Sequence, residues 1–188
     1  MTIESANQTA PVRFLILPDI HNFKYNSDGP FRNPTPKVDV VLHSGGLIQV
    51  GGTSEYKRAL NLLATIPAEL KLVIAGNHDL SLDSNYWKTV EEDERESEKE
   101  DHEEVMGIMT GKLAKAAGGT YLEKGMHAFT LQNGATFTIY ASHYQPKFGD
   151  WAFHYERNED RFNGPENPAT GSTSIATNPI PDSPVLIL

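Results

Sequence analysis

The amino-acid sequence predicts an α/β fold in which two β-sheets are flanked by helices. Short apolar runs in the first half of the chain end abruptly at glycine or polar residues, as buried strands do. A segment with helical periodicity separates two of these runs, and after Gly118 the pattern changes to the alternation typical of antiparallel strands. With 188 residues, 38% of them hydrophobic, the chain is long enough for one domain with a buried core.

The first strand is predicted at residues 12–17, which are nearly all apolar and are therefore expected to be buried on both faces. Residues 1–10 before it are polar, and we expect a disordered leader there. The stretch 22–37 after the strand contains three prolines and a glycine, so we expect a loop that walls one side of a site.

A β-α-β unit is predicted next. Residues 38–42 and 70–75 are its two strands, and Thr53 is the expected N-cap of the helix between them, which Pro67 ends. The apolar residues of this helix recur at helical spacing, namely Tyr56, Leu60, Leu63 and Ala64. Because such units are usually right-handed with parallel strands, the ends of the first three strands should lie on one edge of the sheet.

The second half of the chain predicts a helical region over residues 80–113 and then a second, more antiparallel sheet. Its strands are expected at 120–123, 127–131 and 136–140. Asn133-Gly134 is a strong signal for a two-residue hairpin between the last two. A long polar loop at 156–182 precedes a further apolar strand, which we expect to be buried, at 184–188.

Charge and composition exclude several classes of function. Of the net charge of -9, residues 91–104 contribute -8 (ten acids, two bases), so the rest of the chain is nearly neutral. This balance argues against a nucleic acid or an anionic membrane as partner. The acidic segment indicates a solvated helix face, with cation binding as the alternative. No apolar run approaches the roughly 18 residues of a membrane span, and without a signal peptide we expect a cytoplasmic protein.

Polar side chains follow two of the predicted strands. Asp19 and His21 come directly after the first, two residues apart, so that on an extended segment they point to the same side as two ligands of one metal ion would. Asn77 and His78 follow the third strand after Gly76. Because the chain has no cysteine, only His, Asp, Asn and Glu are left to form a metal site.

These motifs resemble the opening signature of the calcineurin-like metallophosphoesterases, which is Asp-x-His, then Gly-Asp, then Gly-Asn-His. The chain is most similar to the metallophosphoesterase-domain-containing proteins of animals and fungi. The resemblance implies hydrolysis of a small phosphorylated molecule or nucleotide with divalent Mn, Fe, Zn or Mg. It also implies that Asp19 and His21 bind the first ion, that Asn77 binds the second, and that His78 assists the leaving group or binds the phosphate.

The chain departs from this family at Gly46, which stands where the family has the aspartate that bridges the two ions. The family's C-terminal Thr-His-Gly-Pro-Pro and Gly-x-His elements also have no counterpart. We therefore expect residues 11–188 to form an incomplete domain without its last strands, with weakly bound metal and impaired or lost activity. The alternatives are an active enzyme, a non-catalytic binder of a nucleotide or protein, and an unstable fragment. Homo-oligomers could form through the exposed sheet edge.

Four neighbouring residues could complete the site or serve the fold. We expect Asp39 to be a pairing or turn-facing residue of its strand, and His43 to pack in the strand as a structural histidine. Asp79 is expected to orient a histidine or to cap the next helix. His143 could supply an imidazole from the second sheet, although a structural or solvent-facing role is favoured.

Overall fold

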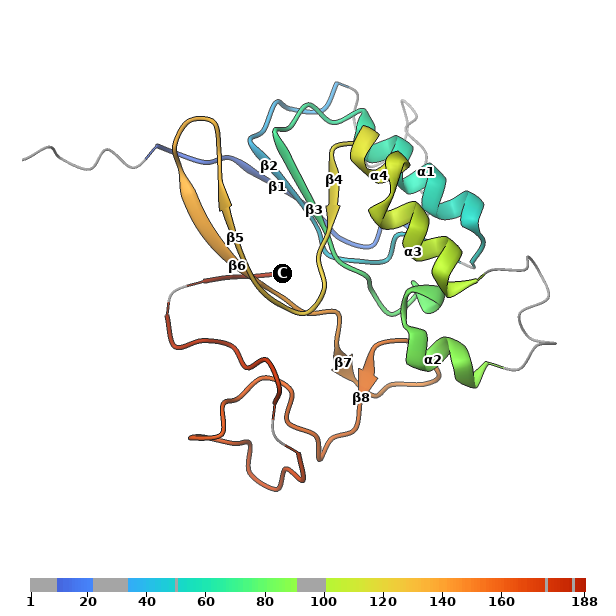
Figure 1. Cartoon of the computed structure of the whole chain (residues 1–188), viewed down its shortest axis with the longest axis vertical. Coiled ribbons are helices and arrows are strands. Elements are labelled where there is room, and N and C mark those ends of the chain that lie inside the picture. The colour runs from blue at the N-terminus through green and yellow to red at the C-terminus, as the bar shows by residue number, and fades with distance from the viewer. Residues whose placement is uncertain (1–9, 22–33, 50, 91–100, 175, 184) are drawn as a thin grey trace, which may run out of the picture.

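The computed structural model describes residues 10–21, 34–49, 51–90, 101–174, 176–183 and 185–188. The predicted leader falls almost wholly outside these ranges, as do most of the predicted loop at 22–37 and the acidic stretch at 91–100. The described chain has two main sheets, with helices covering one of them (Figure 1). This arrangement confirms the predicted fold class.

The first sheet is parallel, in the order β1-β2-β3-β4. Its strands are β1 (Phe14–Leu17), β2 (Val40–His43), β3 (Leu70–Val73) and β4 (Gly119–Tyr121). The register places Leu17 beside His43 and His43 beside Val73, so the first three strands end together. This register confirms the predicted β-α-β unit. The prediction that β4 belongs to the second sheet is wrong, because β4 pairs with β3 in parallel.

Helices α1 (Thr53–Ala64), α3 (His102–Thr110) and α4 (Lys112–Ala116) lie on one side of this sheet (Figure 1). The buried side chains of this layer include Tyr56, Leu60, Leu63, Val105 and Met109. Between α1 and α3 lie the short helix η1 (Leu80–Leu82) and α2 (Ser84–Thr89). The helical region predicted at 80–113 is thus present, broken into separate pieces.

The predicted N-cap of α1 is wrong by one residue. Thr53 is the first helical residue, and Gly52 precedes the helix with no side chain to cap it. The φ angle of Gly52 is 96°, a value that glycine adopts readily and a threonine does not.

The second sheet contains the hairpin β5 (Gly125–Thr130) and β6 (Thr136–Ala141), with β9 (Leu186–Ile187) parallel to β6. Two short strands, β7 (Gln145–Pro146) and β8 (His154–Tyr155), form a separate pair. The hairpin was predicted, but its loop has three residues. Leu131 and Ala135 pair across residues 132–134, and Gly134 has the positive φ of 83° that such loops place last.

A second core fills the space between the two main sheets, with Val40, Leu42, Leu72 and Ile139 among its buried residues. The predictions of burial for the first and last strands are contradicted: Ile16 is 63% exposed and Ile187 is 65% exposed. Among the strands that the structure describes, β1 and β9 each lie at the edge of their sheet. An edge strand has a neighbour on one side only, so apolar composition does not guarantee that it is covered.

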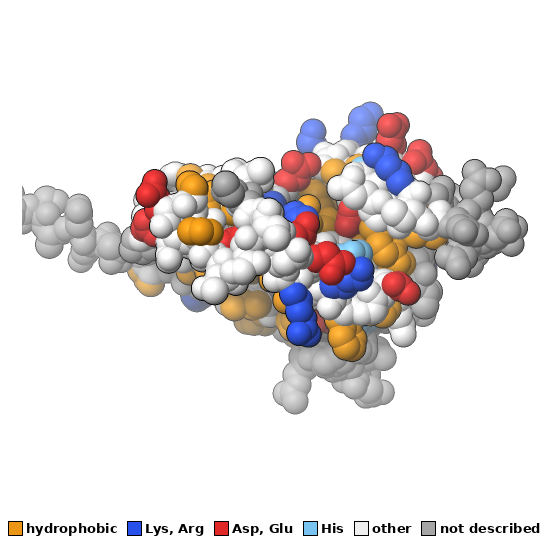
Figure 2. Space-filling view, turned by 90° about the horizontal axis from the view of Figure 1, so that it is seen from below, with side chains coloured by type: hydrophobic (Ala, Val, Ile, Leu, Met, Phe, Trp, Pro, Cys, Tyr) orange, Lys and Arg blue, Asp and Glu red, His pale blue; other side chains and the backbone are white. Residues whose placement is uncertain are grey.

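The surface seen from below carries acidic and basic side chains interspersed with small hydrophobic patches (Figure 2). Neither sign of charge dominates the coloured residues of this face. In the described part of the chain, no helix is both long enough and apolar enough to cross a membrane.

Candidate metal centre

The predicted site residues lie on the loops that follow β1 and β3. The loop after β2 lies between them, and the His21 amide donates to the Gly46 carbonyl oxygen over 2.9 Å. The Ser44 amide likewise donates to the Leu17 carbonyl oxygen over 3.1 Å. Hydrogen bonds therefore tie the ends of neighbouring strands together, as the parallel sheet predicted.

Three of the predicted residues form a compact cluster. Oδ1 of Asp19 lies 3.9 Å from Nε2 of His21, and the rings of His21 and His78 lie 4.6 Å apart between centroids. The Nδ1 atoms of His21 and His78 lie 3.2 Å from the carbonyl oxygens of Ile48 and Gln49, respectively. A carbonyl oxygen can only accept, so in both rings Nδ1 carries the proton and Nε2 is left to face a ligand.

The backbone of this cluster is strained. Asp19 and His21 have φ angles of 25° and 40°, in the region that residues other than glycine rarely adopt. Such conformations cost on the order of 1–3 kcal/mol each and are concentrated at functional sites. The strain agrees with a role for this loop in placing side chains at the sheet edge.

Asp79 forms a buried framework beneath the cluster. Its Oδ2 accepts hydrogen bonds from the amides of Gly46 and Gly76, at 3.1 and 2.7 Å, and its Oδ1 accepts from those of Leu47 and Ile48, at 3.0 and 3.2 Å. Asp79 is the residue that precedes η1, as the expectation of a cap required, but its side chain makes no capping hydrogen bond there. The carboxylate instead joins the loops after β2 and β3. Burial raises the pKa of Asp79 to about 7, although the four N–H donors counteract that rise.

The loops after β2 and β3 approach each other through glycine. A Cβ added to Gly45 would lie 2.5 Å from the Gly76 backbone. Gly46 has a φ of 64°, and a Cβ there would lie 2.3 Å from Oδ1 of Asp19 and 2.8 Å from its Cα. In this conformation, position 46 offers neither a bridging carboxylate nor the space for one.

The donor set fits one metal ion only in part. Asp19 and His21 offer an oxygen and a nitrogen close enough to ligate the same divalent ion, with water completing its shell. Asn77 is half-buried in the loop that carries His78. Among the described residues, no group of three or more His, Cys, Asp or Glu side chains could hold a metal ion. The same donors do not fit a pair of ions, because no carboxylate in the described part of the chain is placed to bridge them.

Asp39, His43 and His143 serve the fold in the structure. Asp39 accepts a hydrogen bond from the Arg13 amide at 2.7 Å and contacts its guanidinium, which together lower the pKa of this carboxyl. Burial lowers the pKa of His43 and of His143 to about 4. The ring of His143 stacks against Tyr121 at 5.8 Å. These positions agree with the structural roles expected for all three.

Sequence reasoning missed the contact between Trp151 and His78. Its ring lies 4.2 Å from that of His78 between centroids, and so covers one side of the cluster. The amide of Ala152 next to it donates to the Asn77 carbonyl oxygen at 3.3 Å, which holds this segment against the loop after β3. The aromatic composition of residues 144–153 was visible in the sequence, but nothing in the spacing indicated which ring would face a histidine.

Comparison with known proteins agrees with the family resemblance of the sequence motifs. The sequence model of the calcineurin-like phosphoesterases matches residues 12–177. The probable rhamnogalacturonate lyase C of Emericella nidulans is 30% identical over 148 residues, which are 79% of this chain and 12% of that protein. Metallophosphoesterase domain-containing protein 1 of Homo sapiens is 29% identical over 131 residues, 66% of this chain and 36% of that protein.

A third relative is the UPF0046 protein T07D4.2 of Caenorhabditis elegans. It is 24% identical over 164 residues, which are 85% of this chain and 39% of that protein. The matched region thus spans 12–39% of the length of these three relatives.

Proposed function

Since the chain belongs to the calcineurin-like phosphoesterase family, we propose that it binds a small phosphorylated molecule, such as a nucleotide, and that its capacity to hydrolyse phosphoesters is impaired or lost. The alternative is a wholly non-catalytic member that binds a nucleotide or a protein. Both proposals assign the ligand to the sheet edge that carries Asp19, His21 and His78, and they differ in whether any turnover remains.

The observation that carries this proposal is the geometry at Gly46. Two divalent ions a few ångströms apart repel each other, and a bridging carboxylate offsets that repulsion. Here the backbone of the loop after β2 lies against Asp19, at a distance that a side chain on residue 46 would not allow. The loss therefore involves the packing of two loops as well as one side chain.

The remaining residues have separate roles in this proposal. Asp19 and His21 would hold one divalent ion, which would supply a positive charge to neutralise phosphate oxygens. With Nδ1 of His78 held by the Gln49 carbonyl oxygen, its Nε2 would take up a second proton, and the resulting imidazolium would donate a proton or a hydrogen bond to the phosphate or its leaving group. Trp151 packs against His78, fixes its ring and limits the access of water to one side of it.

The test combines thermal unfolding with an assay on the same sample. Mn²⁺ or Zn²⁺ should raise the melting temperature of the wild type, and Asp19→Ala and His21→Ala should each abolish that rise. Hydrolysis of bis-p-nitrophenyl phosphate should be slow or absent, and any that occurs should be lost in His78→Ala. His127→Ala, on strand β5, is the matched control. Rapid metal-dependent turnover that requires His78 would overturn the proposed impairment.

A second copy of this chain is a further proposed partner. Ile16 is 63% exposed on β1, and no strand among the described residues pairs with the outer edge of β1. Unpaired strands readily add a strand from another molecule. Light scattering coupled to size-exclusion chromatography should detect a dimer that Ile16→Lys weakens; a monomer at all concentrations would exclude this mode of assembly.

A further inference from the structure

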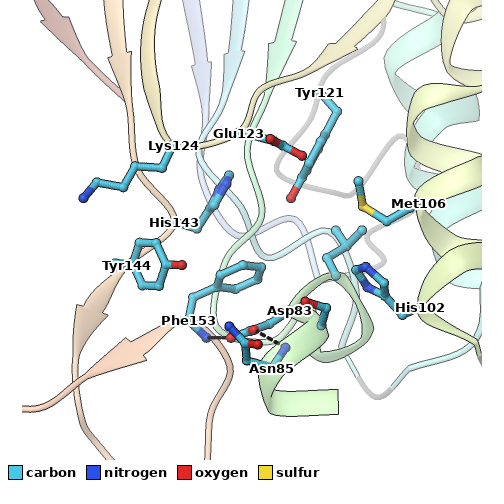
Figure 3. A pocket seen from close by; sticks show the side chains of 12 residues that line it. Asp83, Asn85, His102, Met106, Tyr121, Glu123, Lys124, His143, Tyr144 and Phe153 are labelled. Carbon is cyan, nitrogen blue, oxygen red and sulfur yellow. Dashed lines mark hydrogen bonds between the residues drawn. The ribbon is translucent and has the colours of Figure 1, made fainter. Parts of the chain in front are cut away.

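A cavity of about 270 Å³ lies apart from the Asp19–His21–His78 cluster. It is open on one side and is lined by the start of α2, by α3, by the residues after β4 and by the segment after β6 (Figure 3). The segment that carries Trp151 and Phe153 separates the two places, because Trp151 packs on His78 whereas Phe153 lines the cavity.

The charges that line the cavity are mainly negative. Asp83 and Glu123 both lie in its wall, and within the described ranges neither forms an ion pair with a lysine or an arginine. The carboxylate of Asp83 caps the N-terminus of α2 and accepts hydrogen bonds from the backbone amides of Asn85, Tyr86 and Phe153. Among the described residues, no lysine or arginine pairs with it. An anionic ligand is therefore disfavoured.

Lys124 also lines the cavity, but its ammonium group is directed elsewhere. Its Nζ donates to the Arg161 carbonyl oxygen, and Figure 3 shows the side chain extending away from the central space. The pKa of Lys124 is lowered by burial and by the charge of Arg161. The ammonium group of Lys124 thus lies beside the rings of Tyr144 and Phe162, and the side chain extends away from the central space.

Three aromatic rings line the cavity, those of Tyr121, Tyr144 and Phe153 (Figure 3). The imidazoles of His102 and His143 line it as well, and His143 stacks on Tyr121. The hydroxyl groups of both tyrosines point toward the central space. The guanidinium of Arg161 lies 4.1 Å from the centroid of the Tyr144 ring, so one face of this ring is already occupied by a cation. Aromatic faces attract ammonium groups through their quadrupole, and more strongly when water is excluded.

We propose that this cavity binds a small organic cation that carries a single ammonium group, of about the size of choline. The rings would surround its alkyl groups, and Asp83 and Glu123 would balance its charge. This proposal does not depend on the proposed phosphoester function, since the two sites share no side chain.

The test is isothermal titration of the full chain with choline and with 3,3-dimethylbutan-1-ol, which has the same shape without the charge. Choline should bind, and the neutral alcohol should bind at least about tenfold more weakly. Glu123→Gln should weaken choline binding by about fivefold or more, because it removes charge and preserves shape. Glu103→Gln, on the exposed face of α3, is the matched control and should bind as the wild type does.

The proposal would be overturned if choline did not bind at 50 mM, roughly 100-fold above a moderate dissociation constant. It would also be overturned if choline and the alcohol bound equally, or if Glu123→Gln left the affinity for choline unchanged. Asp19→Ala should leave choline binding intact even if it abolishes metal binding. If Asp19→Ala instead abolished choline binding, the cation would occupy the cluster, and the assignment to the cavity would be wrong.

Discussion

The candidate site consists of two regions that differ sharply in how completely they are built. The buried framework is the Asp79 carboxylate with the four amides that it binds, from the loops after β2 and β3. The cluster above it contains Asp19, His21 and His78. Asp19 is its one carboxylate, and among the described residues no further carboxylate completes or bridges a metal site there. The framework is complete and the donor set is not. The hydrogen bonds that position the loops of a site can thus be kept when the metal ligands carried by those loops are incomplete.

The largest expected effect comes from removing the framework carboxylate. Asp79→Ala leaves four amides without their acceptor in a buried place, and we expect it to lower the free energy of unfolding by about 3–5 kcal/mol. Urea denaturation at pH 7 measures the change. Asp79→Asn, which retains one acceptor oxygen, should lose less. A loss below about 1 kcal/mol in Asp79→Ala would show that the loops hold together without this network.

Whereas the raised pKa of Asp79 stabilises the fold as pH falls, His43 at the end of β2, next to the framework, should destabilise it in acid. The Gly45 amide donates to its Nδ1 over 3.3 Å, and its Nε2 is buried without a hydrogen-bond partner among the described residues. Its pKa is lowered from 6.5 to about 4. As pH falls from 6.5 to 4, His43 becomes protonated in the unfolded chain but stays neutral in the folded chain. This group should therefore remove up to about 3 kcal/mol of stability in that interval.

Urea unfolding at a series of pH values between 7.5 and 4 measures this dependence. His43→Gln should flatten it, whatever its effect on stability at neutral pH. His127→Gln, a substitution of a half-buried residue of β5, should retain the pH dependence of stability of the wild type. An unchanged slope in His43→Gln would assign the acid sensitivity to other groups, among which His143 is the first to test because burial lowers its pKa in the same way.

The contact between framework and cluster can be tested at Gly46. Gly46→Asp restores the residue type of the family but places a Cβ against Asp19, so we expect a loss of about 1–3 kcal/mol of stability and no gain in turnover. Gly134→Asp, at a hairpin glycine of positive φ with open space around its Cβ position, controls for the backbone effect alone. Metal-dependent hydrolysis in Gly46→Asp would show that one side chain suffices to restore the centre.

The smallest effect on stability is expected in the cluster itself. Asp19→Asn removes a carboxylate that is 61% exposed, so the metal-free protein should change by less than about 0.5 kcal/mol. The rise in melting temperature with Mn²⁺ should nevertheless disappear. Differential scanning calorimetry with and without the metal measures both quantities. A retained rise would mean that the ion binds elsewhere.

The agreement between sequence and structure is greatest where spacing and strand order decide the outcome. The cluster at the ends of β1 and β3 follows from parallel strands and from the two-residue spacing of Asp19 and His21. The structure differs where partners distant in sequence matter. The membership of β4 in the first sheet depends on where the preceding helix α4 packs. The exposure of Ile16 depends on which strands flank β1. An alternating or apolar composition shows neither which sheet a strand joins nor which strands flank it.

By itself, the sequence determined the fold class, the family and the glycine at position 46, because these depend on residue types and their order. Only the tertiary structure decided that Asp79 binds backbone amides, that Trp151 covers His78 and that Gly46 packs against Asp19. Apart from the hydrogen bond between Asp79 and the nearby Gly76 amide, these contacts join segments that the chain separates by more than 20 residues. Their geometry is fixed by how loops converge at a sheet edge, and no local pattern in the sequence records it.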